Sequence, residues 1–149
     1  MRVLGLDLGS RRIGVAVSDP GQVIATPHGV VERSGDEAVD HRRILEIARE
    51  LGAERIVVGL PLSLDGSVGP AAAAALAEVE RLGATTDLPV DTYDERFTTV
   101  TADRHLRARK KQGRARREVI DQTAAAVMLQ AWLDGRPRPT DTPTSRDPA

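Results

Sequence analysis

The segment GLDLGSRRIGVAVSD, residues 5–19, consists of two apolar stretches separated by a short glycine- and arginine-containing turn. Residues 2–8 and 12–19 are each long enough for a strand, and the turn at 9–11 predicts an antiparallel β-hairpin. Alternation along the first strand places its leucines on one face and Asp7 on the other. A carboxylate buried without a partner is strongly destabilising. We therefore expect Asp7 to bind a metal ion, a nucleotide phosphate or a neighbouring arginine.

The pattern changes after the hairpin, from antiparallel strands to alternating strands and helices. The sequence predicts further strands at 22–31, 55–60 and 88–95, and helices at 36–51, 70–83, 98–108 and 118–134. This order indicates an α/β fold, a mixed sheet with helices packed on its faces. The segment 135–149 contains four prolines, and we expect it to be a disordered tail.

The composition limits the classes of site and of location. A chain of 149 residues with 40% hydrophobic residues is expected to form one globular domain, here 1–134. There is no cysteine, and the three histidines lack the spacing of metal ligands, so any metal would be a hard cation held by carboxylates. No apolar run is long enough to span a bilayer or to form a signal peptide. We therefore expect a cytoplasmic protein without a membrane partner.

Two loops follow predicted strands and could contact a ligand. The loop in VGLPLSLDGSVGP, residues 58–70, leads into a helix N-terminus, where backbone N–H groups and the Ser67 hydroxyl could bind a phosphate. A tight turn at Asp65-Gly66 with a helix cap is the alternative interpretation. In DERFTT, residues 94–99, acids follow the end of a strand, where ligands bind in open α/β sheets. Asp94 and Glu95 point in different directions, and we choose Glu95 as the residue that faces the site.

A third acid lies at the start of the last predicted helix. Asp121 continues the stripe formed by Ala125, Met128 and Trp132, so it is expected to face the sheet. Asp7, Glu95 and Asp121 would then be buried like charges, which repel one another unless a cation is present. Mg²⁺ or Mn²⁺ suits such oxygen ligands, and two ions about 4 Å apart can catalyse phosphodiester cleavage.

Four motifs occur together in this chain: LGLDLGSRRIGVAVSD, VGLPLSLDGSVGP, DERFTT and IDQTAAAVMLQAWLD. In this order and spacing they resemble the YqgF family, described as pre-16S rRNA nucleases and as RuvX-type Holliday junction resolvases. The resemblance covers residues 1–134. It implies an RNase H-like fold, with a five-stranded mixed sheet whose first three strands are antiparallel and helices on both faces. It also implies a metal-dependent nuclease in which the family's acidic residues correspond to Asp7, Glu95 and Asp121.

Nucleic-acid contacts are expected around these acids. The net charge is only −1, but residues 104–117 contain eight of the 21 basic residues and no acid, which predicts a mobile loop that binds phosphates. With one residue each of Phe, Trp and Tyr, base stacking is not expected to dominate. The candidate nucleic-acid-binding residues are Ser10, Arg11, Arg12, Ser67, Arg96, Arg109, Lys110, Lys111 and Arg114.

The leading hypothesis is a nuclease that acts on structured RNA, maturing the 5′ end of pre-16S rRNA, in contact with a ribosomal precursor particle. Holliday junction resolution is the alternative, and it would require a dimer rather than a monomer. A nucleotide-binding ATPase or kinase would need a second lobe, for which 149 residues leave no room. A non-catalytic RNA-binding protein in ribosome assembly is a further possibility.

Overall fold

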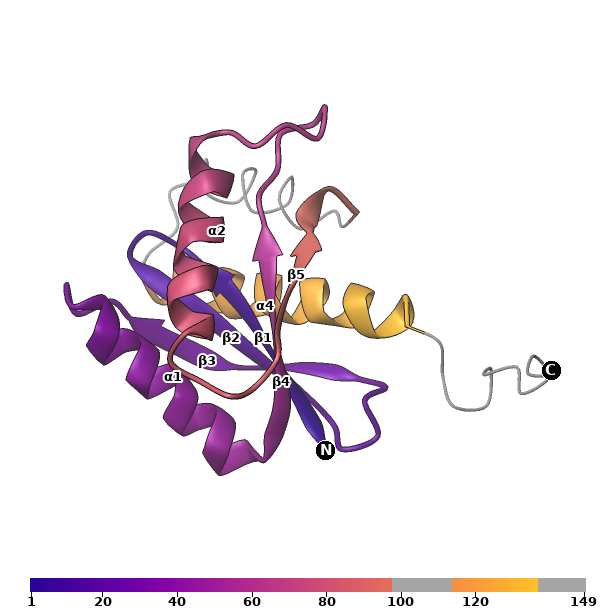
Figure 1. Cartoon of the computed structure of the whole chain (residues 1–149). Coiled ribbons are helices and arrows are strands. Elements are labelled where there is room, and N and C mark those ends of the chain that lie inside the picture. Colours follow the sequence, from indigo (N-terminus) through magenta and orange to yellow (C-terminus); the bar gives the residue numbers. More distant parts are fainter. Residues whose placement is uncertain (98–113, 137–149) are drawn as a thin grey trace, which may run out of the picture.

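A five-stranded mixed sheet forms the centre of the protein (Figure 1). The computed structural model describes residues 1–97 and 114–136, and between 114 and 120 only the backbone. The strands are β1 (Arg2–Leu8), β2 (Arg12–Ser18), β3 (Ala25–Glu32), β4 (Ala53–Leu60) and β5 (Val90–Asp94). Their order across the sheet is β3-β2-β1-β4-β5. The first three strands pair antiparallel, whereas β4 pairs parallel with both β1 and β5.

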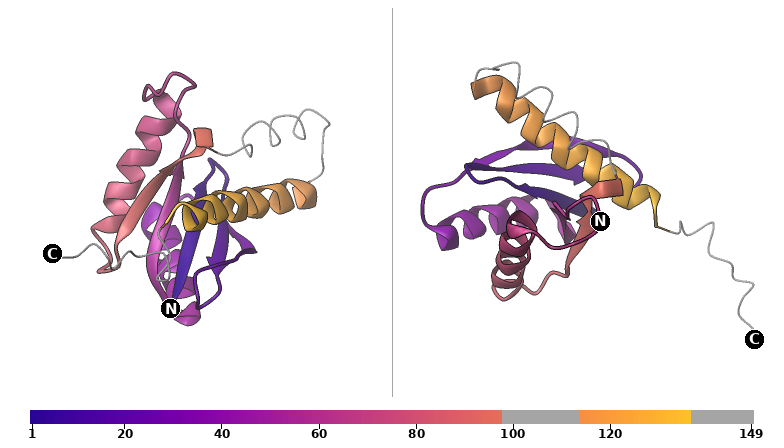
Figure 2. Two further views of the ribbon diagram at one scale, coloured as in Figure 1. Left: turned by 90° about the vertical axis from the view of Figure 1, so that its right-hand side faces the viewer. Right: turned by 90° about the horizontal axis from the view of Figure 1, so that it is seen from above.

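Helices cover the two faces of the sheet unequally (Figure 2). The described helical elements are α1 (Glu37–Leu51), α2 (Pro70–Gly83), the 3₁₀ turn η1 (Glu95–Phe97) and α4 (Arg114–Asp134). One core cluster packs leucines of β1, such as Leu4 and Leu6, against α1 and α2. The other packs Val3 against Leu129 and its neighbours on α4. We call these two sides the α1/α2 face and the α4 face.

Local signals place the ends of the helices. Asp36 accepts hydrogen bonds from the first free N–H groups of α1, and Gly52 ends that helix with a φ of 70°. Pro70 opens α2, where a proline loses no helical hydrogen bond. None of the helices in the described part of the chain is long and apolar enough to cross a membrane.

The predicted elements within the described residues are confirmed, with corrections to their ends. The strand predicted at 22–31 begins at Ala25, and Glu95 belongs to η1 rather than to the strand predicted at 88–95. The hairpin and its turn are present, and the third predicted strand is β3, at an edge of the sheet. The last helix starts at Arg114 rather than 118, so residues 114–117 of the predicted basic loop are helical. The predicted helix 98–108 and most of the proline-rich tail lie outside the described residues.

Candidate active site

Asp7 lies near the end of the central strand, on the α4 face. Its position follows from alternation, because Val3 packs in the α4 cluster and Gly5 touches Leu129 of that helix. Asp7 is buried, with 7% of its surface exposed. On β2, Gly14 pairs directly with Asp7. On β4, Val58 pairs with Leu6, the residue before Asp7. The next residue along β4 is Gly59.

Gly14 allows the third acid to approach Asp7. A Cβ atom at this position would overlap the backbone carbonyl of Asp121. The backbone of α4 therefore rests directly on β2 at the residue that pairs with Asp7. Strands in a sheet lie about 4.8 Å apart. Asp121 is thus brought to the strand next to Asp7, as the helical stripe predicts.

Gly59 of β4 leaves room for the second acid, Glu95, on the other side of Asp7. A Cβ atom at Gly59 would lie 2.6 Å from Oε2 of Glu95. Glu95 belongs to η1, which follows β5 at once, and its side chain turns back over β4 and is buried. Glu95 and Asp121 therefore flank Asp7 on the α4 face, each above a glycine of an adjacent strand.

Asp94 points elsewhere, although it precedes Glu95. Its carboxylate accepts hydrogen bonds from Nε and Nη2 of Arg96 at 2.6–3.1 Å. These bonds hold the pKa of Asp94 below its ordinary value, despite the opposing effect of desolvation. Asp94 and Arg96 thus neutralise each other. Of the two adjacent acids Asp94 and Glu95, Glu95 is the one whose side chain turns toward the sheet.

The chemistry of the three acids suits a hard divalent cation. All the donors they offer are carboxylate oxygens, which Mg²⁺ and Mn²⁺ prefer. Gly14 leaves room for the backbone carbonyl of Asp121 over β2, and Gly59 leaves room for the Glu95 side chain over β4. Asp7 and Glu95 are buried and Asp121 is half-buried, and a bound cation would reduce the repulsion between these like charges.

One basic group already lies beside these acids. Arg12 is buried, and its Nε is 3.3 Å from Oδ2 of Asp121. Among the described residues, that Nε has no hydrogen-bond partner. As a candidate phosphate ligand, Arg12 therefore differs from Arg11, which is exposed on the turn 9–11 together with Ser10.

The remaining candidate residues are spread around this end of the sheet. The turn interpretation of the loop before α2 is confirmed: Gly66 has a φ of 88°, and Asp65 accepts a hydrogen bond from the backbone N–H of Ser67. Ser67 itself is exposed. Arg96 also donates to the carbonyl of Leu64, which ties this loop to the end of β5. Arg109, Lys110 and Lys111 lie outside the described residues, as does the side chain of Arg114.

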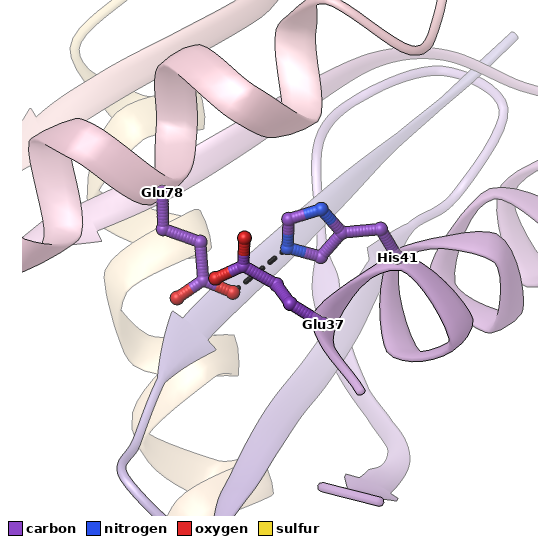
Figure 3. Close-up of side chains that lie close together, drawn as sticks. All are labelled: Glu37, His41 and Glu78. Carbon is purple, nitrogen blue, oxygen red and sulfur yellow. Dashed lines mark hydrogen bonds and ion pairs between the residues drawn. The ribbon is translucent and has the colours of Figure 1, made fainter. Parts of the chain in front are cut away.

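The α1/α2 face contains a second group of ionisable side chains that the sequence analysis missed. Glu37, His41 and Glu78 offer ligand atoms that all lie within 4.8 Å of one another (Figure 3). Each carboxylate, however, already accepts two hydrogen bonds from an arginine, Glu37 from Arg81 and Glu78 from Arg33. Two arginines therefore already balance the negative charge of these carboxylates, and we interpret the group as an ion-pair network rather than a metal centre. The available signal was Glu78 itself, an acid in the buried helical stripe of Ala72, Ala75 and Leu82.

Comparisons with known proteins agree with this arrangement. The family model described as "RuvX: Holliday junction resolvase" matches residues 1–135. A protein of Rhodococcus opacus (strain B4), named "Putative pre-16S rRNA nuclease", is 49% identical over 141 residues, covering 92% of this chain and 79% of that protein. A protein of the same name from Desulforudis audaxviator (strain MP104C) is 43% identical over 136 residues, covering 91% and 96%.

A solved structure shares the fold. It is "T. thermophilus RuvC in complex with Holliday junction substrate", which matches with a TM-score of 0.55 at 20% identity and covers 89% of this chain and 93% of that one. The expected five-stranded, RNase H-like sheet is thereby confirmed. Because the family model covers nearly all of the described chain, the protein belongs to the RuvX family.

Proposed function

We propose that this protein is a metal-dependent nuclease that hydrolyses phosphodiester bonds of structured RNA, processing the 5′ end of pre-16S rRNA. The observation that carries the proposal is the pair of glycines beside Asp7. Gly14 and Gly59 let Asp121 and Glu95 approach the central carboxylate from its two neighbouring strands. Three carboxylates around one strand end offer the oxygen donors that a hard divalent cation takes.

Asp7, Glu95 and Asp121 would hold Mg²⁺ or Mn²⁺, in a two-metal-ion site. When bound, such ions activate water and stabilise the leaving oxygen of a phosphodiester. The exposed Ser10 and Arg11 would contact substrate phosphates on one side of the acids, and Ser67 and Arg96 on the other. Arg12 would balance the charge of Asp121 and contact a phosphate that approaches it. The basic segment 104–117 would add phosphate contacts from the residues before Asp121.

The choice of RNA rests on the relatives, which carry the name of a pre-16S rRNA nuclease at 40–49% identity. It implies a cytoplasmic enzyme that meets its substrate on a ribosomal precursor particle. The alternative is cleavage of branched DNA, which the description of the family favours. Symmetric cleavage of a four-way junction would need two copies of the site and hence a dimer; RNA processing requires only a monomer.

The experiment offers the purified protein two substrates, a pre-16S rRNA fragment and a four-way DNA junction, each with Mg²⁺ and with Mn²⁺. We expect cleavage of the RNA near its mature 5′ end, dependent on the metal and abolished by Asp7→Asn. Glu37→Gln, which alters an acid on the opposite face, is the matched control and is expected to cleave as wild type does.

Each other outcome selects a different function. Resolution of the junction with the RNA left intact would establish the recombination alternative. Binding of the RNA without cleavage at any concentration of either metal would favour a non-catalytic role in ribosome assembly. Full activity of Asp7→Asn would exclude the three-acid site.

A further inference from the structure

Arg33 holds the turn between β1 and β2 at two points. It directly follows β3, and its backbone N–H donates to the carbonyl of Arg11 at 3.0 Å. Its side-chain Nε donates to the carbonyl of Gly9 at 2.7 Å. The turn 9–11 carries Ser10 and begins two residues after Asp7, so Arg33 fixes a segment that lies at the candidate active site.

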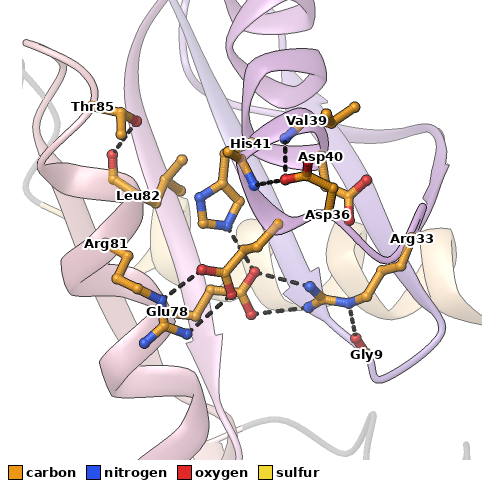
Figure 4. A network of polar contacts seen from close by, with 12 residues as sticks. Gly9, Arg33, Asp36, Val39, Asp40, His41, Glu78, Arg81, Leu82 and Thr85 are labelled. Atoms are coloured by element: carbon orange, nitrogen blue, oxygen red, sulfur yellow. Dashed lines mark hydrogen bonds and ion pairs between the residues drawn. The ribbon is translucent and has the colours of Figure 1, made fainter.

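Glu78 in turn fixes the guanidinium of Arg33. Nη1 and Nη2 of Arg33 each donate to one carboxylate oxygen of Glu78, both at 3.0 Å (Figure 4). This fork-to-fork geometry constrains both the position and the orientation of the guanidinium. The pair is largely buried, with 19% of the Arg33 side chain and 9% of the Glu78 side chain exposed. His41 of α1 contacts the same carboxylate through Nε2 at 2.8 Å, which limits the movement of Glu78.

The network therefore links helices of the α1/α2 face to a turn at the edge of the α4 face. A free arginine side chain would sample many rotamers, and ordering it costs conformational entropy. In this protein the Arg33 side chain is already ordered in the folded state, because Glu78 and Gly9 bind the two sides of its guanidinium. Arg33 also lines, with Ser10 and Arg11, a cavity on the surface beside the turn.

We propose that Arg33 and Glu78 are positioning residues of the candidate active site, which hold the turn 9–11 so that Ser10 and Arg11 are preorganised for a substrate phosphate. This inference rests on the proposed nuclease function. Arg33 acts on the turn through the carbonyls of Gly9 and Arg11, and Glu78 acts through Arg33. Their loss should weaken substrate binding more than the chemical step, because a turn that is not fixed must be ordered each time RNA binds.

The kinetic test compares two variants of the Arg33–Glu78 ion pair with a control variant of a similar ion pair elsewhere on the same face. Arg33→Lys keeps the charge, but a compact ammonium lacks the planar fork whose separate nitrogens bond to the two Glu78 oxygens and to Gly9. Glu78→Gln keeps the shape and removes the charge. The control is Arg81→Lys, because Arg81 and Glu37 form the same kind of two-bond ion pair between α2 and α1 without touching the turn.

For both network variants we expect the KM for the RNA fragment to rise about tenfold while kcat changes less than about twofold. Arg81→Lys should leave both constants near wild type. Arg11→Ala should raise KM in the wild-type background and add little in the Arg33→Lys background, because both changes then affect the same contact. Unchanged KM in the network variants, equal losses in Arg81→Lys, or fully additive effects would each overturn the inference.

Amide hydrogen exchange gives a readout that does not depend on activity. Residues 9–12 should exchange faster in Arg33→Lys and Glu78→Gln than in wild type or Arg81→Lys, while β1 and α4 stay protected. Equal exchange at the turn in all four proteins would contradict the positioning role. If the wild-type protein cleaves no RNA, the proposed function fails, and the exchange comparison still decides whether this network holds the turn.

Discussion

Both faces of the sheet carry groups of carboxylates, but the surroundings of these carboxylates differ. On the α1/α2 face, Glu78 and Glu37 each accept two hydrogen bonds from an arginine fork. On the α4 face, the backbone of Asp121 lies over Gly14 and the side chain of Glu95 lies over Gly59, on the two strands beside Asp7. The first arrangement matches each negative charge with a positive one in the folded chain. The second places three acids around one end of β1, with Arg12 beside Asp121, and we propose that a metal ion binds between them.

This difference separates residues that stabilise the fold from residues that serve the reaction. A substitution on the α1/α2 face should change the free energy of unfolding or the mobility of the turn. A substitution on the α4 face should remove activity, and where its steric effect is confined to a side chain, it should do so with little change in stability.

Gly14→Ala should have the largest effect of the glycine changes. The new Cβ would overlap the backbone carbonyl of Asp121, so α4 has to shift away from the sheet. Overpacking of this kind costs about 1–3 kcal/mol in the free energy of unfolding. Displacement of Asp121 should reduce cleavage by about a hundredfold.

Denaturant unfolding and cleavage rates test this expectation. The matched control is Gly29→Ala on the neighbouring strand β3, where a Cβ would meet nothing within 4 Å. Wild-type stability and activity in Gly14→Ala would show that α4 does not rest on β2 at this point.

Gly59→Ala should reduce activity without a matching loss of stability. The three atoms nearest to the new Cβ belong to the Glu95 side chain, which can rotate away. We expect the free energy of unfolding to stay within about 1 kcal/mol of wild type and cleavage to fall about tenfold or more. Wild-type activity would mean that Glu95 can move from this position without consequence, and would remove it from the site.

The smallest effect is expected for Glu37→Gln, and it should depend on pH. Hydrogen bonds from Arg81 hold the pKa of Glu37 below its ordinary value of 4.5. A lowered folded-state pKa stabilises the protein above the unfolded value, and this contribution is lost as the pH falls through the folded value. The pair is substantially exposed, so solvent screens it.

Unfolding of wild type and Glu37→Gln across the acid range measures this contribution. The stability difference should be present at neutral pH, decrease as the pH falls below the ordinary pKa of 4.5, and disappear below the lowered folded-state pKa. A difference that is the same at every pH would show that packing, and not the ion pair, explains it.

Much of the α4 face could be predicted from the sequence because its signals are periodic. Alternation in β1 placed Asp7 on the opposite face from the leucines, and helical spacing placed Asp121 toward the sheet. The roles of Gly14 and Gly59 could not be predicted in the same way. They depend on which strands are neighbours of β1 and on how closely α4 approaches, and both are set by tertiary packing.

The α1/α2 network was missed for the same physical reason. Arg33, His41 and Glu78 come from a strand end and two helices, up to 45 residues apart in the chain. No local spacing relates them. Glu78 in an apolar stripe was the available signal, equivalent to that of Asp121, but its partners are identified only once the helices are packed.

Metal binding tests the contrast between the two faces most directly. Mn²⁺ would be titrated calorimetrically into wild type, Asp7→Asn and Glu37→Gln, with circular dichroism to establish that all three are folded. We predict that wild type and Glu37→Gln bind the ion alike and that Asp7→Asn loses binding. Unchanged binding by Asp7→Asn together with loss in Glu37→Gln would place the metal on the α1/α2 face and contradict the account.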